Sequence, residues 1–365
     1  MKVVKVDLGK RGYDIFIGSG AVTKLPRIVS EISENAPAVI ITDRNVISGS
    51  GKILGSALKK IKNPVVKIVL EPGERSKSFK VFSGTVNKIA SATRGHKPVI
   101  VAVGGGVVGD LAGFVASSYR RGVPLVQVPT TLLAQVDSSI GGKAGIDLPE
   151  AKNIVGAFYQ PRVVLSDVDF LASLPSRQIS NGMAEVVKYS VIKSPGMFVA
   201  LEKNAGKIRA LDKRFMEKIV GECAEIKAGI VKKDELDTMD IRIILNYGHT
   251  LGHALETASG YSDLYNHGES VSVGMLMAGE IALRLGIFAK RDLGRLEKLL
   301  FELNLPVRIK KVNGSKILDA CKYDKKFTSG KTRFVLPCSI GKVKVVEDVP
   351  PGMIRSVVSC FMEKR

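Results

Sequence analysis

The sequence predicts an α/β domain with a mostly parallel, Rossmann-like but non-standard sheet, followed by a mostly α-helical domain. The first half contains continuous runs of β-branched residues separated by helical stretches, the pattern of a parallel sheet covered on both faces. Each run ends in polar or glycine-rich residues, where open α/β sheets bind their ligands. After about residue 174 long helical patterns replace the strand-like runs, so we expect two domains, residues 1–174 and 175–365.

The first domain is expected to begin with a hairpin and to continue with five buried strands. Residues 3–8 and 13–17 alternate apolar and polar side chains around a glycine-containing turn, as the strands of a hairpin do. The five apolar runs follow at residues 38–43, 65–70, 98–103, 125–128 and 162–165.

The second domain is expected to contain five helices and a small hairpin. Residues 271–285 are apolar on nearly all sides, which is typical of a helix inside a helical core, and Gly286 follows where a C-terminal cap belongs. The hairpin is expected over residues 333–336 and 343–346. The helical patterns cover residues 180–193, 208–234, 242–259, 270–286 and 291–303.

The composition is that of an ordinary globular protein, with 45% hydrophobic residues. No apolar run reaches the roughly 20 residues of a membrane span, and the N-terminal residues lack the apolar core of a signal peptide. We therefore expect a cytoplasmic protein with no membrane partner. The four cysteines lie far apart with no Cys-x-x-Cys pair, as expected of reduced thiols.

The net charge of +20 raises nucleic acid as a partner. However, the basic residues are spread along the chain, tryptophan is absent and aromatic residues make up only 6%, so a base-stacking surface is not expected. We expect an anionic small molecule as the partner, and no nucleic acid.

Three of the four histidines lie close together in the sequence, at His249, His253 and His267. On a helix, His249 and His253 would share one face one turn apart, a spacing that suits two imidazoles converging on a metal ion or an anion. The zincin motif is excluded, because it needs Glu directly after the first histidine and this chain has Thr250. A third ligand must come from His267 or a remote carboxylate. The alternative is a set of ordinary polar residues.

A glycine-rich loop with the pattern Gly104-x-Gly106-x-x-Gly109 follows one of the predicted strands and precedes a helix. Such glycines let backbone amides approach a pyrophosphate at a helix N-terminus. The acidic residue expected about 20 residues later is missing, so the sheet is not a standard Rossmann unit. Asp110 could contact the cofactor or favour the helix start, and Asp43, at the end of an apolar strand, is the better candidate for a ribose or adenine contact.

A second glycine-rich stretch, Gly141-Gly142-Lys143, does not fit a Walker A motif, which would need Gly at position 137 and Ser or Thr at position 144. We interpret it as a flexible loop that places Asp137, Lys143, Lys152 and Asn153 in one region. Lysines in a glycine-rich loop suit an anionic substrate. The alternative is a solvated surface loop.

Glu185 and Lys188 share a helical face at a spacing of three residues, which usually indicates a surface ion pair. Here the flanking residues are apolar, so the pair is a candidate for a crevice. Glu185 is our candidate for the missing carboxylate ligand.

Taken together, these motifs resemble the 3-dehydroquinate synthase family. The resemblance extends in order from about residue 13 to residue 345, and its longest block makes it specific. The stretches that carry it are residues 104–110, 129–143, 152–153, 184–188, 246–253 and 267–269.

The resemblance implies a dehydroquinate-synthase-like fold and an NAD-dependent, zinc-containing cyclase of the shikimate pathway, in a homodimer. Co²⁺ is a second possible metal, because sites of two histidines and one glutamate also accept it. Members convert 3-deoxy-D-arabino-heptulosonate 7-phosphate to 3-dehydroquinate and phosphate, in aromatic amino acid biosynthesis. The reaction combines a transient oxidation by NAD, β-elimination of phosphate, re-reduction and an intramolecular aldol closure.

The resemblance also implies roles for individual residues. The metal ligands would be Glu185, His249 and His267. The NAD contacts would be Asp43, Glu71, Glu74, Lys77, Gly105, Gly106, Val107, Asp110, Thr130, Thr131, Lys143, Lys152 and Phe170. The substrate and catalytic residues would be Asp137, Lys143, Asn153, Lys188, Lys227, Arg242, Asn246 and His253, with Arg121 reaching the neighbouring subunit's site and either Lys325 or Lys326 approaching the substrate.

Within this set, we expect Lys188, Asn153 and His253 to hold the phosphate, and Lys227 and Arg242 to hold the carboxylate. The chain is one residue longer than the family pattern between Glu235 and Arg242. Two alternative functions share parts of the pattern. A 2-deoxy-scyllo-inosose synthase would not need residues for a substrate carboxylate, and a glycerol-dehydrogenase-like oxidoreductase would lack the block at residues 137–143 with its lysines.

Overall fold

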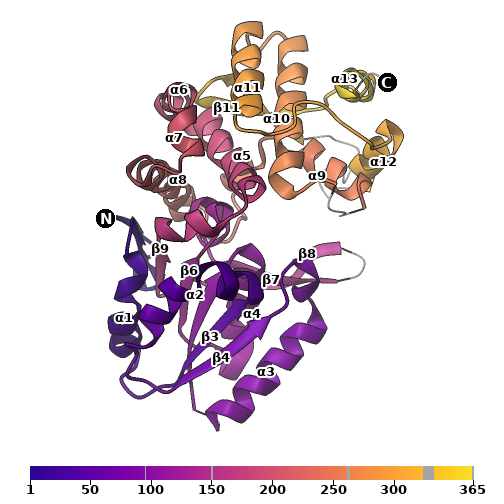
Figure 1. Ribbon diagram of the computed structural model, residues 1–365. Coiled ribbons are helices and arrows are strands. Elements are labelled where there is room, and N and C mark those ends of the chain that lie inside the picture. The colour runs from indigo at the N-terminus through magenta and orange to yellow at the C-terminus, as the bar shows by residue number, and fades with distance from the viewer. Residues whose placement is uncertain (95, 149–150, 261–263, 324–332, 364–365) are drawn as a thin grey trace. The chain divides into compact units, whose positions relative to one another are not determined.

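The computed structural model describes residues 1–94, 96–148, 151–260, 264–323 and 333–363 (Figure 1). The chain forms two compact units: Met1–Pro175 with Leu211–Leu236, and Ser176–Ala210 with Asp237–Arg365. The first break lies at Pro175, next to the expected boundary. Residues 211–236 were expected in the second domain but belong to the first unit. Helix α8 (Lys213–Lys233) packs its buried face on β1 of that unit and on the turn at Ala134–Ser138.

The first unit is built on a seven-stranded sheet with the order β1-β2-β9-β6-β5-β3-β4. Only the β1–β2 hairpin is antiparallel, so the prediction of a mostly parallel sheet is confirmed. The central strands are buried on both faces, which explains their continuous apolar sequences. The strands are β1 (Lys2–Val6), β2 (Tyr13–Ile17), β3 (Ala38–Asp43), β4 (Val65–Leu70), β5 (Val99–Gly104), β6 (Leu125–Pro129) and β9 (Val163–Ser166).

Helices cover both faces of this sheet (Figure 1). On one face, α1 (Leu25–Ile32) and α2 (Arg44–Leu58) bury side chains such as Leu25 and Leu54 against the strands. On the other face, α3 (Phe79–Thr93) and α4 (Gly106–Ser118) do the same with Ile89 and Leu111. This three-layer arrangement leaves the carboxyl ends of the parallel strands at one edge, where the glycine-rich loop lies between β5 and α4.

The stretch that we interpreted as a flexible loop is instead an antiparallel hairpin, β7 (Lys143–Leu148) with β8 (Ala151–Phe158). It packs on α4 at a close approach, because a Cβ on Gly113 would lie 2.7 Å from the Cβ of Ala144. The two strands also approach closely at Gly156, where a Cβ would lie 2.2 Å from the carbonyl oxygen of Ala144. Glycine is uncommon in strands and weakens them, so the glycines in β7 and β8 make the hairpin hard to predict from the sequence.

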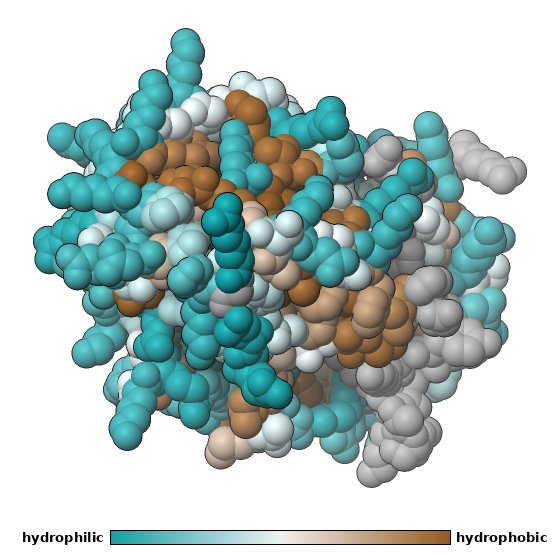
Figure 2. Space-filling view, turned by 90° about the horizontal axis from the view of Figure 1, so that it is seen from below, coloured by the Kyte–Doolittle hydropathy of each residue, from teal (hydrophilic) through white to brown (hydrophobic). Residues whose placement is uncertain are grey.

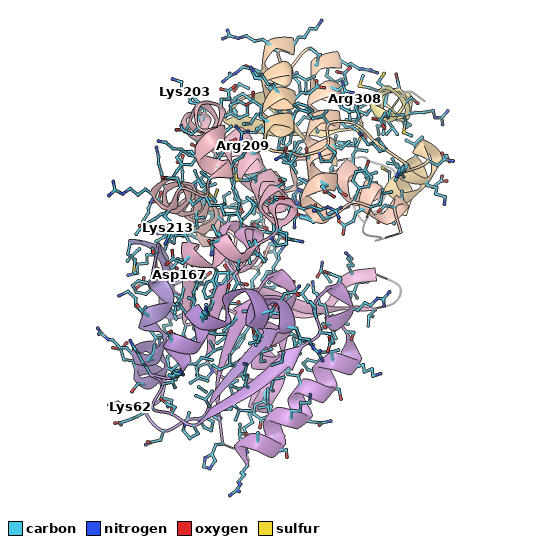
Figure 3. The ribbon with its side chains drawn as sticks, in the orientation of Figure 1. Lys62, Asp167, Lys203, Arg209, Lys213 and Arg308 are labelled. Atoms are coloured by element: carbon cyan, nitrogen blue, oxygen red, sulfur yellow. The ribbon has the colours of Figure 1, made fainter. Side chains whose placement is uncertain are left out.

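Asp167 ties the start of the chain to the end of β9. It is fully buried, and its carboxylate accepts hydrogen bonds from the backbone N–H groups of Gly20 (3.1 Å), Val22 (3.0 Å) and Asp169 (3.0 Å). Lys213, labelled in Figure 3, belongs to the same unit. It forms an ion pair with Asp169 at 2.6 Å, in which the lysine side chain is largely exposed. Asp167 is expected to contribute more to the free energy of unfolding than the Lys213–Asp169 ion pair. Buried backbone donors cannot bind water when their acceptor is lost.

We therefore expect Asp167→Ala to lower the free energy of unfolding by about 2–3 kcal/mol. Lys213→Ala, which removes only the exposed ion pair, should change it by less than about 1 kcal/mol. Urea unfolding followed by circular dichroism measures both values. Equal stabilities of the two variants would contradict the structural role of Asp167.

The second unit is mostly helical and is organised around α10 (His267–Arg284), which contacts α5, α9, α11, α13 and β10. Nearly every residue from Gly268 to Ala282 is buried, as the apolar sequence predicts. Gly286 adopts the left-handed conformation of a helix cap with φ +71°. The other elements are α5 (Ser176–Lys193), α6 (Pro195–Lys203), α7 (Ala205–Arg209), α9 (His249–Ala258), α11 (Lys290–Glu302), α12 (Gly314–Tyr323), α13 (Pro351–Phe361), β10 (Arg333–Ser339) and β11 (Lys342–Glu347).

The predicted helix over residues 242–259 is interrupted. A 3₁₀ turn covers Arg242–Asn246, and α9 begins only at His249, because Gly248 adopts a left-handed φ of +78° between them. Likewise, the helix predicted over residues 208–234 begins at Lys213. The predicted hairpin near the C-terminus is confirmed as β10 and β11.

The exposed surface is largely hydrophilic on the face seen in Figure 2, with scattered apolar patches. The labelled Lys62 and Lys203 project away from the ribbon (Figure 3), in keeping with the dispersed basic residues of the sequence. Among the described helices, none is long and apolar enough to span a bilayer.

Candidate functional site

The histidine cluster is built by a close crossing of α9 and α10. A Cβ on Gly274 would lie 2.0 Å from the carbonyl oxygen of Gly248 and 2.8 Å from the backbone nitrogen of Gly252. Only glycine lets the two helices approach this closely. The crossing brings His249, the first residue of α9, next to His267, the first residue of α10, with their ring centroids 5.3 Å apart.

Helix α5 supplies a carboxylate to the same place. The Oε1 atom of Glu185 lies 3.5 Å from Nε2 of His249 and 3.6 Å from Nε2 of His267. One ligand atom from each of these three residues lies within 4.8 Å of the others. His253, which the helical spacing paired with His249, is not in this group: its ring is 5.1 Å from that of His249, and it is exposed.

The imidazole of His249 is held by the main chain. Its Nδ1 lies 3.0 Å from the carbonyl oxygen of Tyr247, and a carbonyl only accepts, so Nδ1 carries the hydrogen and Nε2 presents its lone pair. Burial lowers the pKa of His249 well below its usual value. This imidazole is therefore neutral, the form that binds a metal ion.

His267 lies between two carboxylates. Its Nε2 faces Glu185, and its Nδ1 lies 3.5 Å from Oε2 of Glu256, a residue near the end of α9. Burial lowers the pKa of His267, but the two carboxylates outweigh this effect and raise the pKa to about 10. In the absence of a metal the imidazole of His267 is thus a cation at neutral pH.

The start of α10 is fixed by two sets of contacts. Asn266 and Glu269 form a reciprocal capping box at the helix N-terminus. Gly268 donates its backbone N–H to Oδ1 of Asn181 at 2.6 Å, and a Cβ on Gly268 would lie 2.2 Å from the carbonyl oxygen of Asn181. Since Asn181 precedes Glu185 by one turn of α5, this contact sets the distance between Glu185 and His267.

These three residues fit a divalent metal ion. Two imidazoles and one carboxylate are the donor set of many catalytic zinc sites, and three protein ligands leave a coordination position open. The group also matches the ligand set expected from the sequence, and its geometry supports that prediction.

Lys188 is fully buried beside Glu185 and forms an ion pair with its Oε2 atom. The surface ion pair that we considered as the alternative is therefore wrong. Burying an ammonium group is costly unless it is paired, so the cation is held where an anion already lies.

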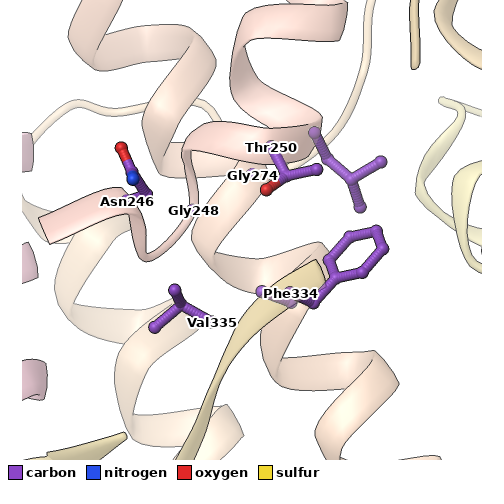
Figure 4. A pocket seen from close by; sticks show the side chains of 8 residues that line it. Asn246, Gly248, Thr250, Gly274, Phe334 and Val335 are labelled. Carbon is purple, nitrogen blue, oxygen red and sulfur yellow. The ribbon is translucent and has the colours of Figure 1, made fainter. Parts of the chain in front are cut away.

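Arg242 and Asn246 belong to the 3₁₀ turn that precedes α9, and Arg242 is buried. A narrow pocket behind this turn, too tight for a water molecule, is mostly apolar and includes Asn246, Gly248 and Thr250 (Figure 4). Because the pocket is narrow and apolar, it belongs to the packing of α9 against α10 and β10 rather than to a ligand site.

In the first unit, the glycine-rich loop lies at the N-terminus of α4, with Gly105 as the N-cap. The loop contacts the residues after β6, because Thr130 donates its N–H to the carbonyl of Gly104 at 2.9 Å and a Cβ on Gly105 would lie 3.0 Å from the side chain of Thr131. The N–H groups at the start of this 13-residue helix suit a phosphate.

Lys77 is the centre of a charged cluster near this loop. It is buried, with its Nζ 2.8 Å from Asp110 and 3.9 Å from Asp147, and it donates to Oδ1 of Asn153. Burial lowers the pKa of Lys77, but the carboxylates around it raise the pKa overall. Nearby, Lys152 lies 3.9 Å from Glu74.

Buried Lys227 and half-buried Asp137 form a second ion pair in this unit, with Nζ 2.5 Å from Oδ1 and 2.7 Å from the main-chain carbonyl of Asp137. Asp43 caps α2, accepting the N–H of Val46 at 2.9 Å. Lys227, Asp137 and Asp43 therefore have structural contacts in addition to the ligand contacts that we predict for them.

The remaining predicted residues are more dispersed. Glu71 pairs with Arg44 at the surface, Lys143 is exposed at the start of β7, and Val107 is half-buried in the first turn of α4. Phe170 is fully buried in the core of the first unit, which explains its aromatic side chain without a cofactor. Lys325 and Lys326 lie outside the described residues.

Sequence reasoning missed three residues that hold the clusters together: Asn181, Glu256 and Asp147. Glu256 follows His249 by seven residues, two helical turns, so its position on the same face could have been noticed. Asn181 and Asp147 act through contacts with the main chain of Gly268 and Asn153, which leave no pattern in the sequence.

Comparison with known proteins extends the match to nearly the whole chain. The family described as 3-dehydroquinate synthase N-terminal matches residues 67–181, and the family described as 3-dehydroquinate synthase C-terminal matches residues 182–327. The 3-dehydroquinate synthase of Desulforamulus reducens is 41% identical over 360 residues, which cover 98% of this chain and 100% of that protein.

Solved structures of two sugar cyclases have the same fold. The 2-epi-5-epi-valiolone synthase from Streptomyces hygroscopicus subsp. jinggangensis 5008, with NAD⁺ and Zn²⁺ bound, is 26% identical, with a TM-score of 0.87 and 96% of each chain covered. A 2-deoxy-scyllo-inosose synthase complexed with carbaglucose-6-phosphate, NAD⁺ and Co²⁺ is 25% identical, with a TM-score of 0.86 over 99% of this chain and 100% of that one. From its sequence and its fold, the chain belongs to the 3-dehydroquinate synthase family of enzymes.

Proposed function

We propose that the protein is a 3-dehydroquinate synthase, a phosphate-eliminating lyase that depends on NAD and a divalent metal ion. It converts 3-deoxy-D-arabino-heptulosonate 7-phosphate to 3-dehydroquinate and phosphate. The observation that carries this proposal is the cluster of Glu185, His249 and His267 beside buried Lys188, in a chain that is 41% identical along its length to a 3-dehydroquinate synthase. Its cytoplasmic location stays a prediction.

Glu185, His249 and His267 would hold Zn²⁺ or Co²⁺, the ions bound in the two related cyclases. When bound, the metal would acidify a substrate hydroxyl, and NAD would accept a hydride and return it. The glycine-rich loop and the N-terminus of α4 would bind the NAD pyrophosphate through their N–H groups.

The basic side chains of the second unit would bind the anionic substrate. Lys188 is buried and forms an ion pair with Glu185, which supports a contact with the phosphate. His253 is exposed next to His249, where a substrate can reach it. Arg242 is buried in the turn before α9 and would bind the carboxylate in a bidentate manner. The assignment of Lys227 to the same carboxylate stays a prediction, since its ammonium group pairs with Asp137.

Metal binding is expected to release about one proton at pH 8. The pKa of His267 is raised to about 10, so this imidazole must lose its Nε2 proton to bind the ion, whereas His249, whose pKa is lowered, is already neutral. The apparent affinity for Zn²⁺ should therefore rise about tenfold per pH unit between pH 7 and 9. Calorimetric titration in buffers of different ionisation enthalpy measures the released proton, and a titration without proton release would contradict this assignment.

We also propose that the protein is a homodimer in which Arg121 serves the neighbouring subunit's site. Arg121 is exposed with φ +62°, in a run of three left-handed residues with Arg120 and Gly122. Such strain is kept where a side chain must be presented in one direction. A monomer in sedimentation velocity at micromolar concentration would contradict the dimer.

The substrate distinguishes this function from its alternatives. The purified protein, loaded with metal and NAD⁺, should release phosphate from the heptulosonate phosphate and not from glucose 6-phosphate, which lacks a carboxylate for Arg242. Preferential release from glucose 6-phosphate would instead support a 2-deoxy-scyllo-inosose synthase. Net reduction of NAD⁺ with simple polyols would support a glycerol-dehydrogenase-like enzyme.

A further inference from the structure

The two imidazoles of the cluster are oriented by different kinds of group. The ring of His249 is fixed by a main-chain carbonyl two residues away, which cannot move without moving α9. The ring of His267 has a carboxylate in the corresponding place, Oε2 of Glu256 at 3.5 Å from Nδ1. His267 is also the more exposed of the two, at 30% against 10%, so its ring has more freedom to turn.

Glu256 is well placed to restrain that ring. It follows His249 by two turns of α9, and the close crossing of α9 and α10 at Gly274 brings it to the N-terminus of α10. Its own side chain is only 13% exposed, so the carboxylate is held close to the ring instead of being solvated.

We propose that Glu256 is a positioning residue, which accepts the Nδ1–H of His267 and holds that imidazole with Nε2 directed at the metal. The proposal rests on the metal centre of the proposed function and adds a residue that does not touch the ion. A carboxylate in this position fixes the tautomer of a ligating histidine and makes it a stronger donor. Without it, the half-buried ring of His267 can rotate or present the wrong nitrogen.

Substitution of Glu256 is therefore expected to lower the affinity for the metal without unfolding the protein. Glu256→Ala should weaken Zn²⁺ binding about 10–100-fold, the usual effect of removing such a partner. Glu256→Gln keeps an oxygen that can accept the hydrogen bond but loses its charge, so its affinity should fall by about threefold to tenfold. Glu280→Gln is the matched control, because Glu280 lies on α10 but forms an ion pair with Arg284, at 2.8 Å, instead of a contact with the histidine cluster.

The test is a titration of the metal-free protein with Zn²⁺ against a chromophoric chelator, together with the visible absorption spectrum of the Co²⁺ form. We expect the wild type and Glu280→Gln to bind Zn²⁺ most tightly, Glu256→Gln less tightly and Glu256→Ala least tightly. The Co²⁺ spectrum of Glu256→Ala should differ from that of the wild type. Thermal unfolding of the metal-free proteins checks that the variants fold, and Glu256→Gln, which keeps the side-chain shape, replaces Glu256→Ala if that variant does not.

The outcomes separate this inference from the function on which it rests. If the wild type binds both ions and the Glu256 variants bind them with the same affinity and the same Co²⁺ spectrum, Glu256 has no positioning role while the metal centre stands. If the wild type binds neither ion, the metal centre itself is wrong and this inference fails with it.

Discussion

Glu185→Gln is expected to lower the rate of phosphate release by about a thousandfold or more, equivalent to about 4 kcal/mol of lost transition-state stabilisation. The substitution removes the only anionic member of the three-residue cluster, among the described residues that form it. It also leaves the buried ammonium group of Lys188 without the carboxylate that it contacts. An uncompensated buried charge costs about 3–5 kcal/mol, so we expect a lower unfolding free energy as well.

Metal content after dialysis, the rate of phosphate release and the unfolding midpoint should be measured on the same preparation. Glu202→Gln is a suitable control, since it removes a carboxylate of the same unit whose ion pair with Arg295 is partly exposed. The control should keep its metal and its activity. A Glu185→Gln protein that retains stoichiometric zinc and more than about a tenth of the activity would show that Glu185 is not a ligand.

Gly274→Ala is expected to separate the two histidines of the cluster. The new methyl group would lie 2.0 Å from the carbonyl oxygen of Gly248, and neither atom can move without moving a helix. Overpacking of this kind costs about 1–3 kcal/mol, and more where backbone is displaced. We therefore expect a loss of at least about 3 kcal/mol in unfolding free energy, together with a large loss of metal affinity, because His249 begins the displaced helix.

Gly294→Ala is the matched control on α11. Nothing lies within 4 Å of a Cβ at Gly294, and the residue is exposed inside the helix. Alanine is the better helix former by about 1 kcal/mol, so this variant should be slightly more stable than the wild type and fully active. If Gly274→Ala were as stable as Gly294→Ala and bound metal normally, the close crossing of α9 and α10 could not be what positions the histidines.

Much of the fold follows from the sequence because its elements have strong patterns. The buried strands β3, β5 and β6 are continuous apolar runs, and α10 is apolar on nearly all sides, so both were predicted near their observed bounds. The β7–β8 hairpin was missed because Gly145 and Gly156, which let its strands cross closely, are poor strand formers. The packing of α8 on β1 was missed because a periodic helix does not reveal which surface it covers.

The candidate site was predictable in part. The helical spacing paired His249 with His253 and left His267 and a remote carboxylate open as further candidates, with Glu185 as the candidate carboxylate. The set of Glu185, His249 and His267 was implied by the family resemblance, and the structure brings these three residues together. The convergence of these three residues depends on Gly274 and Asn181. Gly274 packs against Gly248, 26 residues earlier, and Asn181 accepts the N–H of Gly268, 87 residues later. A glycine inside a helix and an ordinary asparagine carry no sign of such a contact.

The central claim is tested most directly by the balance of products at catalytic concentrations of NAD⁺. The zinc-loaded protein is mixed with 3-deoxy-D-arabino-heptulosonate 7-phosphate and substoichiometric NAD⁺, and phosphate, dehydroquinate and NADH are measured together. We expect equal amounts of phosphate and dehydroquinate over many turnovers, no accumulation of NADH, and loss of the reaction when a chelator removes the metal. Stoichiometric NADH, or no phosphate release from the fully loaded protein, would contradict the assignment of this chain as a 3-dehydroquinate synthase.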